Sequence, residues 1–209
     1  MNNTSGQTSG KQIITIWELY GCGMEEIAAR VAEQLGLPLH GQAFSSEQIE
    51  VATAERERDG AFGRFLRNLS PATIPNSSAA DAVLQEAQTV EDTAREVMST
   101  VNGFAAQGGV ILGYNGAYLL RGRPGALHVK LVGKPDARIA RGAKLAGISE
   151  ERSAKRQPIE DEFRRELSLR IFRFDPTGDD YYDLVIDSTR FAEDDVVALI
   201  VAAAKARAS

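Results

Sequence analysis

Cysteine is nearly absent from this sequence of 209 residues, in which Cys22 is the only one. A single thiol excludes an internal disulfide framework and is typical of proteins from a reducing compartment. No apolar run approaches the roughly 18 residues that a membrane-spanning helix needs. The polar segment 1–11 lacks the apolar centre of a signal peptide, so we interpret it as a disordered tail. We therefore expect a cytoplasmic protein without a membrane partner.

An excess of basic charge is also missing, since 24 Lys and Arg stand against 29 Asp and Glu, for a net charge of -5. Proteins that bind nucleic acid usually present a basic surface, so we expect no nucleic-acid partner. His40 and His128 are the only histidines and have no Cys/His cluster beside them, which argues against a zinc site. The G-x-S-x-G pattern of a nucleophile elbow does not occur either.

Short apolar segments alternate with helical patterns along the chain. The predicted strands are Ile13–Trp17, Val110–Tyr114, Ala126–Gly133 and a last buried one at Asp183–Asp187. The predicted helices are 23–35, 135–146, 149–174 and 193–205, with a helical turn at 118–120. Residues 44–107 also have a helical pattern, interrupted by a predicted loop at 70–81. This alternation favours an α/β fold with a parallel sheet that is covered on both faces.

The stretch YGCGMEEIAARVAEQLG, residues 20–36, is typical of a loop that leads from a strand into a helix. Gly21 and Gly23 would let the backbone approach an anion, and the helix N-terminus offers free N–H groups with a partial positive charge. Ligands of open parallel sheets bind beyond the carboxyl ends of the strands, where this loop is expected. The pattern predicts a phosphate-binding loop. A tight turn that simply requires glycine is the alternative.

A series of motifs extends the argument to most of residues 12–205, with little pattern at about 42–88. They are ITIWELYGCGMEEIA, GYNGAYLLRGRP, LHVKL, RIAR, GISEE and YDLVIDS. In order and spacing they resemble the cytidylate kinase-like family, a branch of the nucleoside monophosphate kinases within the P-loop fold. The resemblance implies three α/β/α layers with a five-stranded parallel sheet in one domain, 12–209. It also implies a helical substrate-side subdomain at about 42–107 and a lid helix at about 148–175.

The resemblance further implies transfer of a phosphoryl group from ATP, with Mg²⁺, to a nucleoside monophosphate or a similar small acceptor. The implied nucleotide-binding residues are Tyr20, Gly21, Cys22, Gly23, Met24 and Glu25. The implied catalytic residues are Arg138, Arg152, Arg156, Asp161 and Arg164. The arginines would stabilise the transferring group, and Asp161 would orient lid or acceptor groups and could pair with Arg164 one helical turn away. A charged surface helix without a catalytic role is the other interpretation of these arginines.

The loop lacks the cations that such a site uses. A Walker-type loop would carry glycine, lysine and serine or threonine where this chain has Glu18, Met24 and Glu25. Relatives carry arginine at positions 18 and 25 and in place of Tyr114. Two unit charges about 4 Å apart interact by roughly 4 kcal/mol at an effective dielectric near 20, so a carboxylate here repels phosphate. Alternatively, Glu25 and Glu26 serve to stabilise the first helical turn.

Two functions therefore stay open. One is a nucleotide kinase that uses ATP and Mg²⁺. The other is a catalytically impaired relative that acts as a ligand-binding or partner-binding module. Cys22 lies near a helix N-terminus, where the pKa of a thiol tends to fall, so redox sensing is a further hypothesis. The helical middle of the chain is a candidate surface for a homodimer.

Overall fold

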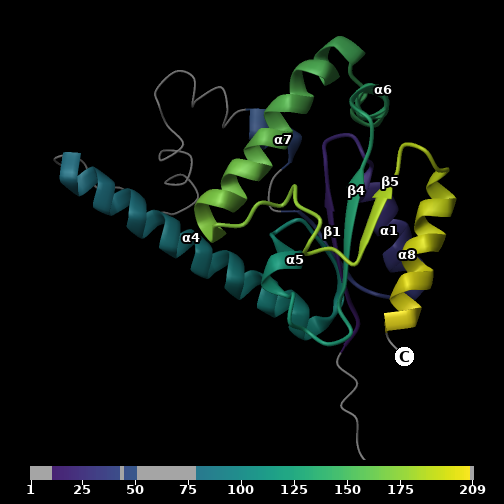
Figure 1. Cartoon of the computed structure of the whole chain (residues 1–209), viewed down its shortest axis with the longest axis horizontal. Helices are drawn as coiled ribbons and strands as arrows, with labels where there is room; N and C mark the ends of the chain where they lie inside the picture. Colours follow the sequence, from purple (N-terminus) through teal and green to yellow (C-terminus); the bar gives the residue numbers. More distant parts are fainter. Residues whose placement is uncertain (1–10, 43–44, 51–78, 208–209) are drawn as a thin grey trace, which may run out of the picture.

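The centre of the molecule is a parallel sheet of five strands. The computed structural model describes residues 11–42, 45–50 and 79–207 (Figure 1). The strands are β1 (Ile13–Glu18), β2 (Leu39–His40), β3 (Gly109–Leu112), β4 (Leu127–Val132) and β5 (Leu184–Asp187). They lie in the order β2-β3-β1-β4-β5, and every neighbouring pair is parallel. The predicted five-stranded parallel sheet is confirmed.

Helices cover both faces of this sheet. They are α1 (Met24–Leu35), α4 (Ala79–Gln107), α5 (Gly116–Leu119), α6 (Pro135–Ala146), α7 (Glu150–Phe172) and α8 (Glu193–Arg207). Figure 1 shows α1 and α8 on one face, α4, α5 and α7 on the other, and α6 beyond the carboxyl end of β4. The result is a three-layer α/β/α arrangement. None of the described helices is long and apolar enough to cross a membrane.

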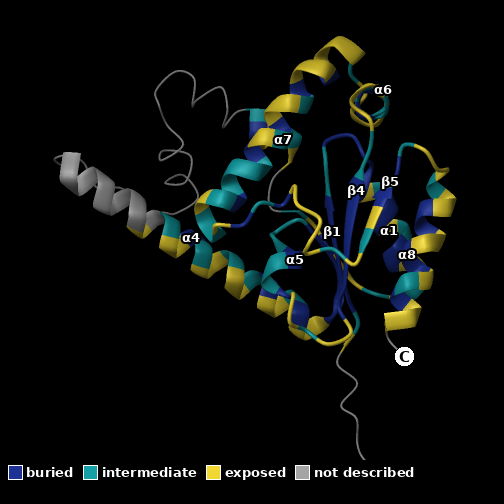
Figure 2. Cartoon of the chain, viewed as in Figure 1, coloured by how far each residue is buried: buried dark blue, intermediate teal, exposed yellow. Residues whose placement is uncertain are grey.

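Strand β1 supplies the core on both sides of the sheet. Ile14 and Ile16 pack with α1 and α8, whereas Ile13 packs with Val101 of α4 and Ile111 of β3. Successive side chains of a strand point to opposite faces, and a sheet covered on both faces needs apolar residues on both. Figure 2 accordingly shows the inner strands as buried along almost their whole length.

Several element boundaries differ from the sequence prediction. Helix α4 begins at Ala79, so the predicted loop at 70–81 extends too far, and its remainder falls outside the described residues. Strand β3 ends at Leu112 rather than Tyr114, because Gly113, Tyr114 and Asn115 all adopt left-handed backbone conformations. Strand β5 is not fully buried: Val185 is 41% exposed because β5 lies at the edge of the sheet.

Strand β2 is the one that the sequence pattern did not locate. It has two residues, too few to show a period, and it forms only through pairing of Leu39 and His40 with Val110 and Ile111 of β3. His40 is held there by its Nε2 atom, which lies 2.9 Å from the carbonyl oxygen of Gly108. Tertiary pairing, rather than local propensity, therefore defines this strand.

Candidate functional site

The predicted phosphate-binding loop lies at the carboxyl end of β1 and runs into α1. Gly21 and Gly23 have φ angles of 80° and 81°, which L-residues rarely adopt. A Cβ atom at Gly21 would overlap the carbonyl oxygen of Arg138, and one at Gly23 would overlap the guanidinium of Arg141. Gly21 is therefore required by the close approach of the α6 backbone, and Gly23 is favoured by its left-handed backbone conformation. The geometry supports the tight-turn interpretation of these two residues, whether or not an anion binds.

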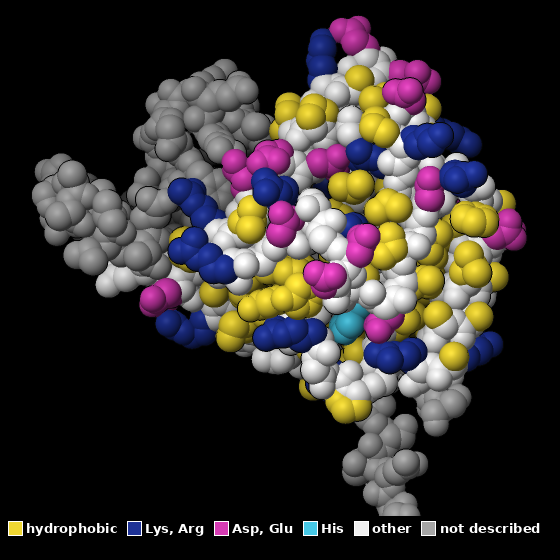
Figure 3. Space-filling model, viewed as in Figure 1, with side chains coloured by type: hydrophobic (Ala, Val, Ile, Leu, Met, Phe, Trp, Pro, Cys, Tyr) yellow, Lys and Arg dark blue, Asp and Glu magenta, His cyan; other side chains and the backbone are white. Residues whose placement is uncertain are grey.

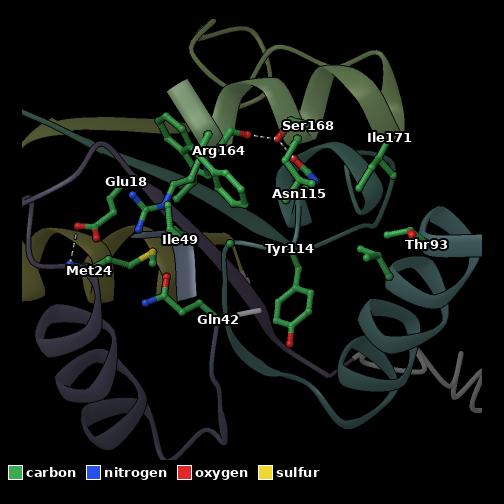
Figure 4. A pocket seen from close by; sticks show the side chains of 15 residues that line it. Glu18, Met24, Gln42, Ile49, Thr93, Tyr114, Asn115, Arg164, Ser168 and Ile171 are labelled. Carbon is green, nitrogen blue, oxygen red and sulfur yellow. Dashed lines mark hydrogen bonds between the residues drawn. The ribbon is translucent and has the colours of Figure 1, made fainter. Parts of the chain in front are cut away.

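An acidic side chain of the protein itself occupies the N-terminus of α1. The Oε2 atom of Glu18 accepts a hydrogen bond from the backbone N–H of Met24 at 2.9 Å (Figure 4). Free N–H groups at the start of a helix are where a phosphate would bind in a loop of this kind. The carboxylate of Glu18 thus takes the position that the sequence analysis assigned to a phosphate group.

The charge of Glu18 is poorly stabilised where it lies. Burial raises the pKa of Glu18 from 4.5 to about 7, the nearby Arg164 and the Met24 N–H lower it in part, and Glu160 and Glu26 raise it further. Loss of water around a carboxylate disfavours the ionised form. Near neutral pH, the Glu18 side chain is therefore present in both ionised and protonated forms.

Asp161 of α7 forms hydrogen bonds with both the loop and α6. Its Oδ1 atom accepts the backbone N–H of Tyr20 at 2.8 Å, and its Oδ2 atom accepts Nη1 of Arg138 at 2.9 Å. The same Arg138 nitrogen donates to the carbonyl oxygen of Tyr20 at 3.0 Å. The suggested pair of Asp161 with Arg164 is wrong, because Arg164 instead lies 3.0 Å from Oε2 of Glu160. Adjacent residues of a helix point in different directions, which separates these two ion pairs.

The remaining two arginines of the predicted catalytic set also have carboxylate partners. Arg156 binds both oxygens of Glu50 at 2.7 Å, and Nη2 of Arg152 lies 3.1 Å from the same carboxylate. The hydrogen bond from Arg156 is the main cause that lowers the pKa of Glu50 to about 2. All four predicted arginines are thus paired with carboxylates. Figure 3 shows acidic and basic side chains interspersed over α7.

Glu50 and Glu160 are the residues that the sequence analysis missed. Glu50 lies in the stretch where the family resemblance fades, 106 positions away from its partner Arg156. Glu160 is next to Asp161 in a charged helix, and no local pattern distinguishes it from its neighbours. Only its complete burial, with a side chain 0% exposed, marks it as part of the site.

Two connected cavities open beside the loop. The first, which we call the loop cavity, has a volume of about 770 Å³ including its mouth. Its lining includes five carboxylates and two guanidinium groups: Glu18, Glu25, Glu26, Glu47, Glu160, Arg156 and Arg164. Of the sequence-predicted site residues it also gathers Tyr20, Gly21, Gly23 and Met24. Cys22, Arg138, Arg152 and Asp161 do not line it.

The second cavity, which we call the apolar chamber, lies beneath α7 and has a volume of about 710 Å³ including its mouth (Figure 4). Trp17 and Tyr114 line it from the ends of two strands, and Phe163, Leu167 and Ile171 from α7. The chamber meets the loop cavity at four shared residues, which are Glu18, Met24, Gln42 and Arg164. A ligand in one cavity would therefore interact electrostatically with the charged residues of the other.

Cys22 lies inside the loop rather than on its surface. Its side chain is 0% exposed, and Ser188 donates a hydrogen bond to its carbonyl oxygen at 2.8 Å. Burial, assisted by the negative charge of Glu18, raises the pKa of the Cys22 thiol to about 12. The expected fall of this pKa is wrong, because loss of solvent outweighs the field of the helix N-terminus.

We therefore expect the native protein to be inert to a thiol reagent such as dithionitrobenzoate at about pH 8, where a free thiolate would react. After unfolding in urea, the single thiol should react completely. The measurement is the absorbance of the released thionitrobenzoate with and without urea. Rapid stoichiometric reaction of the folded protein would contradict the buried position of Cys22 and would revive the redox hypothesis.

Comparison with known proteins identifies the family of this chain. The sequence profile of the cytidylate kinase-like family matches residues 13–190. The chain belongs to the cytidylate kinase-like family. The P-loop kinase fold that the motifs indicated is thereby confirmed, and the family extends over the strands, the loop, α6, α7 and β5.

Individual proteins similar to this chain have low sequence identity to it. The uronate isomerase of Corynebacterium glutamicum is 30% identical over 145 residues, which cover 68% of this chain and 27% of that protein. The chain thus spans about a quarter of that relative. An uncharacterized protein from Eubacterium ventriosum has a similar structure, with a TM-score of 0.62, 19% identity, and coverage of 94% of this chain and 99% of that one. A gluconokinase from Sinorhizobium meliloti has a TM-score of 0.49 at 15% identity, over 95% and 94% of the two chains.

The family implies a nucleotide and a metal ion, but the loop cavity does not fit a triphosphate in the arrangement that the structure shows. The Met24 N–H is bound to Glu18, and among the described residues that line the cavity five are carboxylates and two are guanidinium groups. These two guanidinium groups already face carboxylates, Arg156 with Glu50 and Arg164 with Glu160. A polyphosphate would have to displace Glu18 and would meet repulsion from its neighbours.

Proposed function

We propose that this member of the cytidylate kinase-like family is a small-molecule binding protein that does not transfer phosphoryl groups. It would keep the kinase-like fold as a ligand-binding module and would bind its ligand in the cavities between the loop and α7. A cytoplasmic location, a homodimer, and the division into a substrate-side subdomain and a lid helix stay predictions.

One observation carries this proposal. The carboxylate of Glu18 occupies the N-terminus of α1, with its Oε2 atom 2.9 Å from the N–H of Met24. Phosphoryl transfer depends on cations and N–H groups that hold and neutralise the phosphates. Here the Glu18 side chain occupies that N–H and carries a negative charge whenever it is ionised. The arginines that would offset this charge are paired with Glu50, Asp161 and Glu160.

ATP-dependent transfer to a nucleoside monophosphate, with Mg²⁺, is the second candidate. The family supports it, and so does the position of Arg156 and Arg164 in the wall of the loop cavity. This function would require Glu18 to leave the Met24 N–H and Arg156 to exchange Glu50 for a phosphate group. Both changes break charge-assisted hydrogen bonds, which are among the stronger ones in proteins.

Calorimetric titration with ATP, with and without Mg²⁺, separates the two candidates. We expect the wild-type chain to show no binding up to about 1 mM ATP. At about pH 8, where Glu18 is ionised, the Glu18→Gln variant should bind ATP with a dissociation constant below about 0.1 mM. The variant removes one negative charge near the phosphates, although its amide oxygen can still accept the Met24 N–H. Glu33→Gln removes the same charge from the exposed side of α1 and serves as the matched control, with no expected gain.

Micromolar, Mg²⁺-dependent binding of ATP to the wild-type chain would overturn the proposed function and favour the kinase. Equal ATP affinities of the Glu18→Gln and Glu33→Gln variants would show that Glu18 is not what blocks the loop.

A further inference from the structure

We propose that the apolar chamber binds a small molecule that has a ring-sized apolar body and a cationic head, such as an ammonium group. The inference rests on the proposed function, since it names the class of ligand for that same pair of cavities. It follows from three features of the chamber: its walls, the charges at one end, and the hydrogen bonds that are already formed inside it.

The walls of the chamber favour an apolar body. On α7, Phe163, Leu167 and Ile171 are spaced four residues apart and so form one stripe that faces the sheet. Trp17 closes the chamber from the end of β1, and Val97 from α4. Small-molecule sites are mostly apolar with a few polar groups, and the lining of the chamber has this composition.

Two polar residues on the α7 side of the chamber, Ser168 and Asn115, already contact each other. The hydroxyl of Ser168 lies 2.6 Å from Oδ1 of Asn115 and 2.9 Å from the carbonyl oxygen of Arg164, one turn earlier in α7. Figure 4 shows the Ser168–Asn115 contact on the α7 side of the cavity. A ligand with many polar atoms along its body would have to compete with these bonds, whereas an apolar body leaves them intact.

The charged groups lie together at the other side of the chamber. Among the described residues that line it, only Glu18 and Arg164 are charged. Figure 4 shows both near Met24, and all three residues also line the loop cavity. Behind Arg164, the Oε2 atom of Glu160 lies 3.0 Å from its Nη1 atom. The carboxylates of Glu18 and Glu160 both lie near this one guanidinium, so this end of the chamber carries a net negative charge when both are ionised. Burial raises the pKa of both carboxyls, and a nearby cation would favour their ionised forms.

The excess charge is poorly solvated. The Glu160 side chain is 0% exposed, and burial raises its pKa, although Arg164 and a hydrogen bond from Ser46 lower it in part. The Nη1 atom of Arg164 lies 3.0 Å from Oε2 of Glu160 without the geometry of a well-aligned hydrogen bond. A buried carboxylate without full compensation is stabilised by a nearby cation. An ammonium head would supply that charge along with three N–H donors.

An anionic head would have the opposite effect. The guanidinium of Arg164 is the one cation in the described lining of the chamber, and it already faces Glu160. A carboxylate or phosphate placed at this end would lie beside Glu18 and would repel it. The charges therefore separate this ligand class from a nucleotide acceptor.

The only tryptophan of the chain provides the readout, because Trp17 lines the chamber and is 8% exposed. We would titrate the full chain with 2-phenylethylamine, 2-phenylethanol and 3-phenylpropionate, which share a ring and differ in the charge of the head. The expected change in Trp17 emission is saturable, with the amine binding at least about 10-fold more tightly than the alcohol and the carboxylate the most weakly.

At about pH 8, where Glu18 is ionised, the Glu18→Gln variant should lower the ratio of the amine affinity to the alcohol affinity several-fold. The Glu33→Gln variant should keep the wild-type order. No change in Trp17 emission with any probe up to about 10 mM would show that the chamber is not a ligand site. Equal affinities, or tightest binding of the carboxylate, would overturn the cationic head. These outcomes do not depend on ATP, whereas the proposed function fails only if the wild-type chain binds ATP with Mg²⁺.

Discussion

Replacing Glu18 by glutamine is expected to raise the free energy of unfolding by about 3 kcal/mol at about pH 8 and to leave it almost unchanged below about pH 4. The pKa of Glu18 is 4.5 in an ordinary setting and about 7 in the folded protein. The folded state therefore binds the proton more tightly than the unfolded state. Stability falls as the pH rises from about 4.5 to about 7, and the cost of the ionised carboxylate is complete above that range.

Glutamine retains the contact that positions this side chain, since its amide oxygen can accept the Met24 N–H as the Glu18 carboxylate does. The variant thus removes the buried charge without removing the hydrogen bond. Urea denaturation of the wild type and of the Glu18→Gln variant at a series of pH values measures the difference. The Glu33→Gln variant, changed at an exposed position of the same helix, should follow the wild-type curve. A constant difference between wild type and Glu18→Gln across this range would contradict the raised pKa.

Replacing Asp161 by alanine is expected to destabilise the protein by about 3–5 kcal/mol, as is typical when one partner of a buried ion pair is removed. Arg138 is 4% exposed and would keep its charge without the carboxylate that lies 2.9 Å from its Nη1 atom. The backbone N–H of Tyr20 would lose its acceptor as well. This loss would occur without any ligand, so it identifies a structural role for a residue that the family resemblance implied to be catalytic.

A double-mutant cycle isolates the ion pair from the other contacts of Asp161. Adding Arg138→Met to Asp161→Ala should recover part of the lost free energy, because the unpaired charge is then gone. The matched control is Glu151→Ala on the same helix, which removes an exposed pair with Lys155 and should change stability by less than about 0.5 kcal/mol. A similarly small effect of Asp161→Ala, measured by urea denaturation, would mean that the carboxylate does not hold the loop.

Local patterns in the sequence were sufficient for most of the elements. Helix α6 has the predicted bounds Pro135–Ala146, because a proline at its start and Gly147 after its end are strong local signals. Helix α1 follows its apolar stripe and ends at Gly36 in the same way. The two-residue β2 could not be found, since it exists only through its pairing with β3.

The position of the candidate site could be predicted from the sequence, but the contacts and pKa values of its side chains could not. The glycine loop after β1 was recognisable, and so was the unusual acidic residue at position 18. That the Glu18 side chain binds the first N–H of α1 could not be predicted from the sequence, because this contact depends on how the loop folds and on how far the side chain is buried. The pKa of the Cys22 thiol could not be predicted either, because burial determines it rather than the position near a helix N-terminus.

The sequence by itself determined the family, the alternation of strands and helices, and the loss of cations from the loop, because each of these is encoded by neighbouring residues. Only the tertiary structure decided which charged side chains pair with one another. Arg156 finds Glu50 from 106 positions away, and Arg138 finds Asp161 across two helices. The strength of such pairs depends on distance and burial, which only the folded chain defines.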